Sequence, residues 1–114
     1  MSQKKPVIKP MIKINAPYDG QFIKELQTTS WEEADVVLDE MSALFKDRST
    51  WPPMIERIAI LEKFGKLLAE RADELALQSA QEGGKPLNDS IIEINRAVNG
   101  VSIAIRELAQ LKGT

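Results

Sequence analysis

Two long segments with helical periodicity, separated by one turn, limit most strongly what this chain can fold into. In both segments apolar residues recur every three or four positions, which is the spacing of one helix face. The pattern stops at the stretch Gly-Gly-Lys-Pro, residues 83–86, where either glycine can adopt the left-handed backbone that ends a helix. A proline suits the first turn of the next helix. We therefore predict one helix over about 53–82 and a second that begins between Pro86 and Ser90 and ends near Lys112.

Each of these predicted helices carries a continuous apolar stripe, which indicates a buried face. Phe64 and Leu67 widen the stripe of the first helix, and Gly65 inside it indicates either a close helix contact or simple tolerance. Ile92 and Ile103 lie together on the otherwise polar side of the second helix, either as ordinary surface residues or as a second contact surface. The two stripes consist of Ile58, Leu61, Leu68, Ala72, Leu75 and Ser79, and of Ile91, Ile94, Val98, Val101, Ile105 and Leu108.

The start of the chain predicts a flexible tail followed by a β-hairpin. Residues 1–6 indicate the tail, and an extended pattern begins after them. Pro17 and Gly20 supply turn chemistry between two stretches with strand character. We predict a hairpin with strands over about 7–15 and 21–27, which must lie against something because an isolated hairpin is marginal in water.

A third helix is predicted directly after the hairpin. Ser30 followed by Glu33 matches a capping box, in which each residue bonds the other's backbone N–H. The helix should end near Asp47, and Ser49 or Thr50 could cap the helix that follows. Its apolar positions at helical spacing are Ala34, Val37, Leu38, Met41, Leu44 and Phe45.

Composition excludes several classes of function. The 114 residues carry a net charge of −2, which argues against a nucleic-acid partner. No apolar run approaches a membrane span and no signal-peptide pattern is present, so we expect no membrane partner and a cytoplasmic protein. The sequence contains no cysteine and no histidine. Disulfides, thiolate metal sites, a cysteine nucleophile and a histidine proton shuttle are therefore excluded from this chain.

The remaining polar residues predict no catalytic constellation. Glu32 and Glu33 lie in a first helical turn, where the helix dipole favours acids, so capping is preferred over catalysis. Asp89 and Glu93 are one helical turn apart and could hold a hard cation weakly, although ordinary surface acids are preferred. Lys85 would be an activated amine only if it were buried beside other charges.

Taken together, the segments resemble the N-terminal region of the aldehyde dehydrogenase superfamily. "INAPYDGQFIKEL" is similar to the opening hairpin of that family, although an alanine separates Asn15 from Pro17. "SWEEADVVLDEMSALF" resembles the family's first helix. The long stretch from Glu56 to Val98, with its Glu-x-Gly-Lys-Pro turn, is similar to the second and third helices. The resemblance covers about residues 12–114, and only the hairpin and the first three helices of the family are represented.

The resemblance implies a mainly α fold with a short N-terminal β-hairpin, as a fragment of the family's α/β fold. Residues 7–114 would then form the incomplete N-terminal helical part of a cofactor-binding domain. The implied reaction is the NAD(P)-dependent oxidation of an aldehyde to a carboxylate or thioester. A cysteine attacks the aldehyde, a hydride passes to the nicotinamide, an asparagine helps to hold the oxyanion and a glutamate activates water.

None of that machinery is recognisable here, since cysteine is absent and no glycine-rich strand-to-helix motif occurs. We therefore expect no catalytic residue, no cofactor-binding residue and no bound cofactor in this chain alone, with NAD or NADP bound only by the full-length parent. The expected partners are the remainder of the aldehyde dehydrogenase chain and, for the isolated fragment, further copies of itself. The alternative is a free-standing, non-catalytic helical interaction module.

One family role can be carried over residue by residue. Some members hold a structural monovalent cation with main-chain oxygens before the Asn-Pro turn and a carboxylate three residues before the lysine of the Gly-Lys-Pro turn. The resemblance thus points to Ile14 or Asn15 and to Glu82 as ligands. Oxygen ligands suit a hard cation. The alternative, which we prefer, is that Glu82 only ends a helix or pairs with Lys85.

Overall fold

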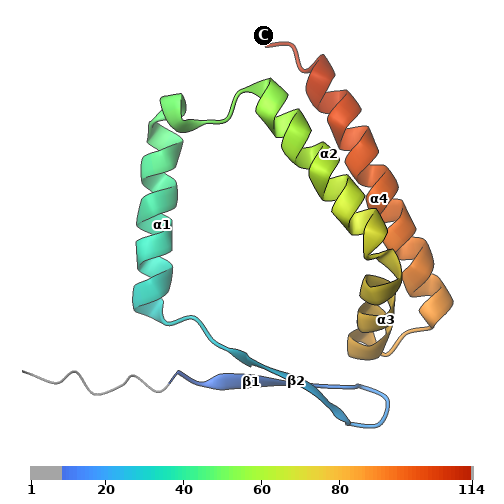
Figure 1. The fold of residues 1–114 in the computed structure, drawn as a ribbon. Helices are drawn as coiled ribbons and strands as arrows, with labels where there is room; N and C mark the ends of the chain where they lie inside the picture. The colour runs from blue at the N-terminus through green and yellow to red at the C-terminus, as the bar shows by residue number, and fades with distance from the viewer. Residues whose placement is uncertain (1–8, 114) are drawn as a thin grey trace, which may run out of the picture. The chain divides into compact units, whose positions relative to one another are not determined.

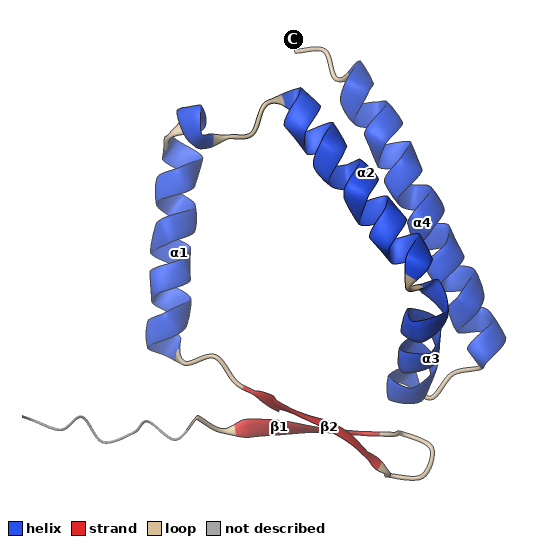
Figure 2. Cartoon of the chain, viewed as in Figure 1, coloured by secondary structure: helices blue, strands red, loops and turns tan. Residues whose placement is uncertain are grey.

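The computed structural model describes residues 9–113. This part of the chain is mainly helical and opens with one two-stranded antiparallel hairpin, as predicted (Figures 1 and 2). It divides into two compact units, one formed by residues 9–15 and 20–51 and the other by 16–19 and 52–113. The predicted tail over 1–6 and the first two residues of the predicted hairpin lie outside the described residues.

The hairpin forms the start of the first unit. Strand β1 (Met11–Asn15) pairs antiparallel with β2 (Phe22–Gln27), and Met11 lies opposite Gln27. A register shift occurs between Ile14 and Asn15, next to the turn. Gly20 adopts a positive φ of 74° in this turn, which glycine permits without steric cost. The predicted hairpin is therefore confirmed, although its first strand begins at Met11 and residues 9–10 are not part of it.

Helix α1 (Trp31–Lys46) follows the hairpin and begins with the predicted capping box. The Glu33 backbone N–H donates to Ser30 Oγ at 3.2 Å, and the Ser30 N–H donates to Glu33 Oε2 at 3.0 Å. The helix ends at Lys46, one residue before the predicted end. No residue of α1 is buried, so its apolar stripe is exposed to solvent.

The expectation that Ser49 or Thr50 caps the following helix is wrong. Asp47 instead organises the short 3-10 helix η1 (Arg48–Thr50), because its Oδ1 accepts from Ser49 N at 3.1 Å and from Ser49 Oγ at 2.6 Å. The next helix starts after Pro53, whose side chain makes no capping hydrogen bond. At this position the proline contributes a fixed φ that is close to the φ of a helix.

The single helix predicted over 53–82 is also wrong, because the chain forms two helices there. These are α2 (Met54–Glu70) and α3 (Ala72–Gly83), and they are separated at Arg71, where φ is −105° and ψ is 14°. The Arg71 guanidinium donates to both carboxylate oxygens of Glu74, at 2.6 and 2.9 Å. This local fork holds the first turn of α3 and satisfies the side chain at the break.

The core of the second unit lies where α2 and α3 both pack against α4 (Leu87–Gln110), a helix of 24 residues. Figure 1 shows the two shorter helices running along it. Neither glycine nor proline marks the break at Arg71 in the sequence. Helix α4 ends at Gln110, two residues before the predicted end.

The predicted apolar stripes form this core. All twelve stripe residues are half-buried between the helices, whereas Phe64 and Leu67 remain about half exposed. Ala76 and Ser90 are the most buried side chains among the described residues, at 1% and 0% exposure, and Ser90 Oγ has no hydrogen-bond partner. Gly65 does mark a close contact, since a Cβ there would lie 3.1 Å from Val101 Cγ1. No helix within residues 9–113 combines the length and apolarity needed to cross a bilayer.

Candidate functional site

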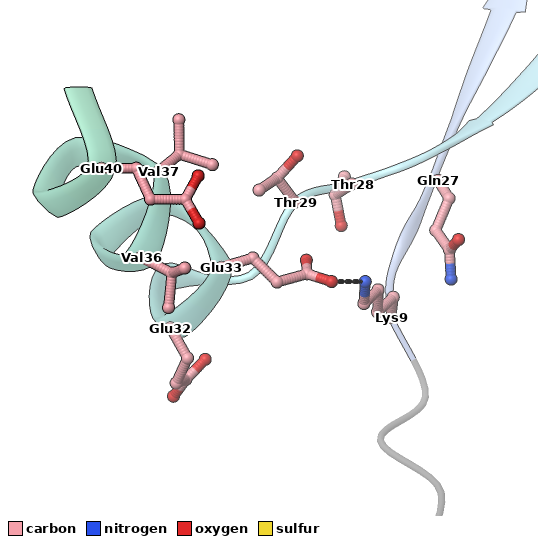
Figure 3. A pocket seen from close by; sticks show the side chains of 9 residues that line it. All are labelled: Lys9, Gln27, Thr28, Thr29, Glu32, Glu33, Val36, Val37 and Glu40. Carbon is pink, nitrogen blue, oxygen red and sulfur yellow. Dashed lines mark hydrogen bonds and ion pairs between the residues drawn. The ribbon is translucent and has the colours of Figure 1, made fainter. Parts of the chain in front are cut away.

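The first unit contains an open groove of about 640 Å³ between the end of the hairpin and the start of α1 (Figure 3). Hydroxyl and amide groups of the chain leaving β2 form one side, and carboxylates and two valines of α1 form the other. The lining residues are Lys9, Gln27, Thr28, Thr29, Glu32, Glu33, Val36, Val37 and Glu40.

Glu33 is the most constrained side chain of this groove. One carboxylate oxygen caps the helix at Ser30, and the other forms an ion pair with Lys9, which Figure 3 shows reaching across from before β1. The pKa of Glu33 lies below the ordinary value of 4.5. The largest cause is the hydrogen bond from Lys9, and the second is the hydrogen bond from the Ser30 backbone N–H. The carboxylate is therefore held in its charged form, which suits capping and not proton transfer near neutral pH.

The groove is polar and open, and one of its hydroxyl groups already forms a hydrogen bond within the chain. Thr28 Oγ1 donates to the carbonyl oxygen of Pro10 at 2.7 Å. Within the described part of the chain, no nucleophile there is paired with a base, as covalent catalysis would require.

The turn between α3 and α4 contains several of the residues that the sequence analysis considered as candidate site residues. Gly84 ends α3 with φ 61°, and the Lys85 N–H donates to the Ala80 carbonyl at 3.2 Å, so the predicted left-handed stop is confirmed. A Cβ on Gly84 would also lie 3.2 Å from Pro17 Cβ. Both the backbone conformation and the close approach of Pro17 thus favour glycine here.

The charged residues of this turn do not pair as expected. Glu82 Oε1 accepts from Gln78 Nε2 at 2.9 Å, within α3. Lys85 forms its ion pair with Glu93 of α4 and not with Glu82. The predicted alternative of a Glu82–Lys85 pair is therefore wrong. The pairing also engages Glu93, which the sequence had offered with Asp89 as a weak cation site.

The predicted cation ligands fall in different units of the chain. Asn15 ends β1, directly after the register shift, and Ile14 lies opposite Lys24 in the hairpin. Glu82 lies one residue before the end of α3 in the second unit. Over residues 9–113, no three acidic side chains gather in a way that could hold a metal ion. A cation site built mainly from main-chain oxygens would not require such a cluster of acidic side chains. The cation site at Glu82 and Asn15 therefore stays a prediction.

Two ion pairs, one in each unit, were not predicted from the sequence. Lys9 lies 24 positions before Glu33, and the pair forms only because the hairpin returns the chain to its start. Lys85 meets Glu93 because the turn folds back onto the first turns of α4. Extending the hairpin register from Met11 and Gln27 would place Lys9 opposite Thr29, which is near Glu33 but does not identify it as the partner.

Comparison with known proteins adds an independent finding. The sequence profile of the aldehyde dehydrogenase family matches residues 5–114. A sulfoacetaldehyde dehydrogenase of Neptuniibacter caesariensis is 30% identical over 102 residues, which are 85% of this chain and 21% of that protein. An N-succinylglutamate 5-semialdehyde dehydrogenase of Chromobacterium violaceum is 32% identical, with 90% and 21% covered. A lactaldehyde dehydrogenase of Methanocaldococcus jannaschii is 30% identical, with 77% and 19% covered. The chain thus spans about a fifth of the length of these relatives.

Proposed function

Because the chain belongs to the aldehyde dehydrogenase family, we propose that it is the N-terminal segment of a longer NAD(P)-dependent aldehyde dehydrogenase. The observation that carries this proposal is the match over residues 5–114 to the family, whose relatives above are about four times as long as this chain. The chain has a hairpin followed by helices, and its match lies in the N-terminal part of those proteins. A cytoplasmic location belongs to the same proposal.

In this proposal the chain supports catalysis and does not perform it. The thiol that attacks the aldehyde cannot come from these 114 residues, because they contain no cysteine. The glycine-rich motif that would hold the nicotinamide cofactor is missing from the sequence as well. The substrate, the hydride acceptor and the water-activating carboxylate would all be handled by the remainder of the enzyme.

The substrate class we propose is an aldehyde that carries a polar group. The names of the three relatives specify a sulfonated aldehyde, a carboxylated semialdehyde and a hydroxylated aldehyde. Each name pairs the reactive carbonyl with at least one further polar group. No side-chain arrangement within residues 9–113 favours one of these three aldehydes over the others.

The partner we propose is the rest of the same polypeptide, and the exposed apolar face of α1 supports it. We call the α1 stripe the set of Val37, Leu38, Met41, Leu44 and Phe45, which are between 50% and 65% exposed. Soluble proteins rarely leave so continuous an apolar surface uncovered. In an intact enzyme further protein would cover the stripe, and in the isolated chain a second copy would.

The direct test is a chimera. The matched segment of the Chromobacterium violaceum relative would be replaced by residues 5–114, and aldehyde-dependent reduction of the nicotinamide cofactor would be measured. We expect a soluble chimera that oxidises the aldehyde of its parent, because the hairpin and helices supply the same supporting surface. An insoluble or inactive chimera beside an active parent would count against the proposal. The purified 114-residue chain should show no such activity.

A matched pair of variants sharpens this test. Leu38→Gln, Met41→Gln and Phe45→Gln together place three amides on the α1 stripe and should abolish folding or activity of the chimera. Asp35→Asn, Asp39→Asn and Lys46→Gln change three positions on the opposite side of α1 and should leave the activity as it was. Full activity in the first variant would show that the rest of the enzyme does not cover the stripe.

The rival function, a free-standing interaction module, makes a different prediction about the gene. Reading the coding sequence past Thr114 separates the two. Continuation in frame into a glycine-rich nucleotide-binding motif and then a cysteine supports the enzyme. A natural stop codon at that point supports the module.

A further inference from the structure

We draw no further inference here: the strongest candidate, the α1 stripe on the first unit, is an unpartnered apolar surface patch, and nothing in the structure shows what covers it.

Discussion

Gly65 lies in the interior of α2, where glycine normally weakens a helix by about 0.5–1 kcal/mol relative to alanine. A Cβ at this position would lie 3.1 Å from Val101 Cγ1, which is closer than ordinary van der Waals contact. Val101 is β-branched and has one strongly preferred rotamer in a helix, so it cannot easily yield, and overpacking of this kind costs about 1–3 kcal/mol. We therefore expect Gly65→Ala to lower the free energy of unfolding by about 1 kcal/mol in urea titrations followed by circular dichroism.

Gly100 supplies the matched control, since it also lies inside a helix but an added Cβ would have no atom within 4 Å apart from its chain neighbours and the backbone of its own helix. Gly100→Ala should raise the free energy of unfolding by about 0.5–1 kcal/mol. Adding Val101→Ala to Gly65→Ala should cost less than the sum of the two single changes, because the smaller side chain removes the overlap. Equal stabilisation by both alanine variants would contradict the close contact.

Glu33 gives a prediction at the same scale about charge. Its pKa is lowered chiefly by Lys9, so the folded state binds a proton less readily there than the unfolded chain does. The stabilisation is present above the ordinary carboxyl pKa of 4.5 and is lost as the pH falls through the lower folded value. In a carbon NMR titration, Lys9→Met should raise the pKa of Glu33 towards 4.5, whereas Lys13→Met should not change it. An unchanged pKa in Lys9→Met would show that the ion pair is absent in solution.

The cap of α1 is an element-scale feature that can be tested in isolation. Ser30→Ala removes the hydroxyl that accepts from the Glu33 N–H and should cost about 1 kcal/mol of helix stability. Ser42→Ala makes the same chemical change inside α1, where alanine is the better helix former, and should increase helicity slightly. Ellipticity and thermal unfolding of the two variants would measure both effects. Equal losses of helicity in both would mean that Ser30 does not act as a cap.

Elements whose cause is local were predictable from the sequence. The capping box at Ser30 depends on two residues three positions apart, and the stop at Gly84 depends on one backbone conformation. The break at Arg71 was not predictable in this way, because no glycine or proline lies at or next to it. Arginine at that position carries no helix-breaking signal of its own. The apolar period of α2 and α3 runs through the break without interruption, so periodicity alone predicts one continuous helix there.

At the scale of the whole molecule, the sequence predicted which helix faces are apolar and did not predict which segment covers each face. The stripes of α2, α3 and α4 form the core because each finds its partner within 114 residues. The α1 stripe has the same helical spacing, yet no residue of α1 is buried. Periodicity identifies a face that needs burial, but the segment that buries it can lie outside the chain.

Exposed apolar surface therefore leads to the prediction for the whole chain. We expect the isolated protein to self-associate, because pairing two α1 stripes removes large side chains such as Leu38 and Phe45 from water. Sedimentation velocity over a range of concentrations should show an increasing average mass. The triple glutamine variant of the α1 stripe should shift that increase to higher concentration, whereas the variant of Asp35, Asp39 and Lys46 should behave as wild type. A chain that stays monomeric at every concentration, with its stripe intact, would show that the α1 stripe is not an association surface and would weaken the case that further protein normally covers it.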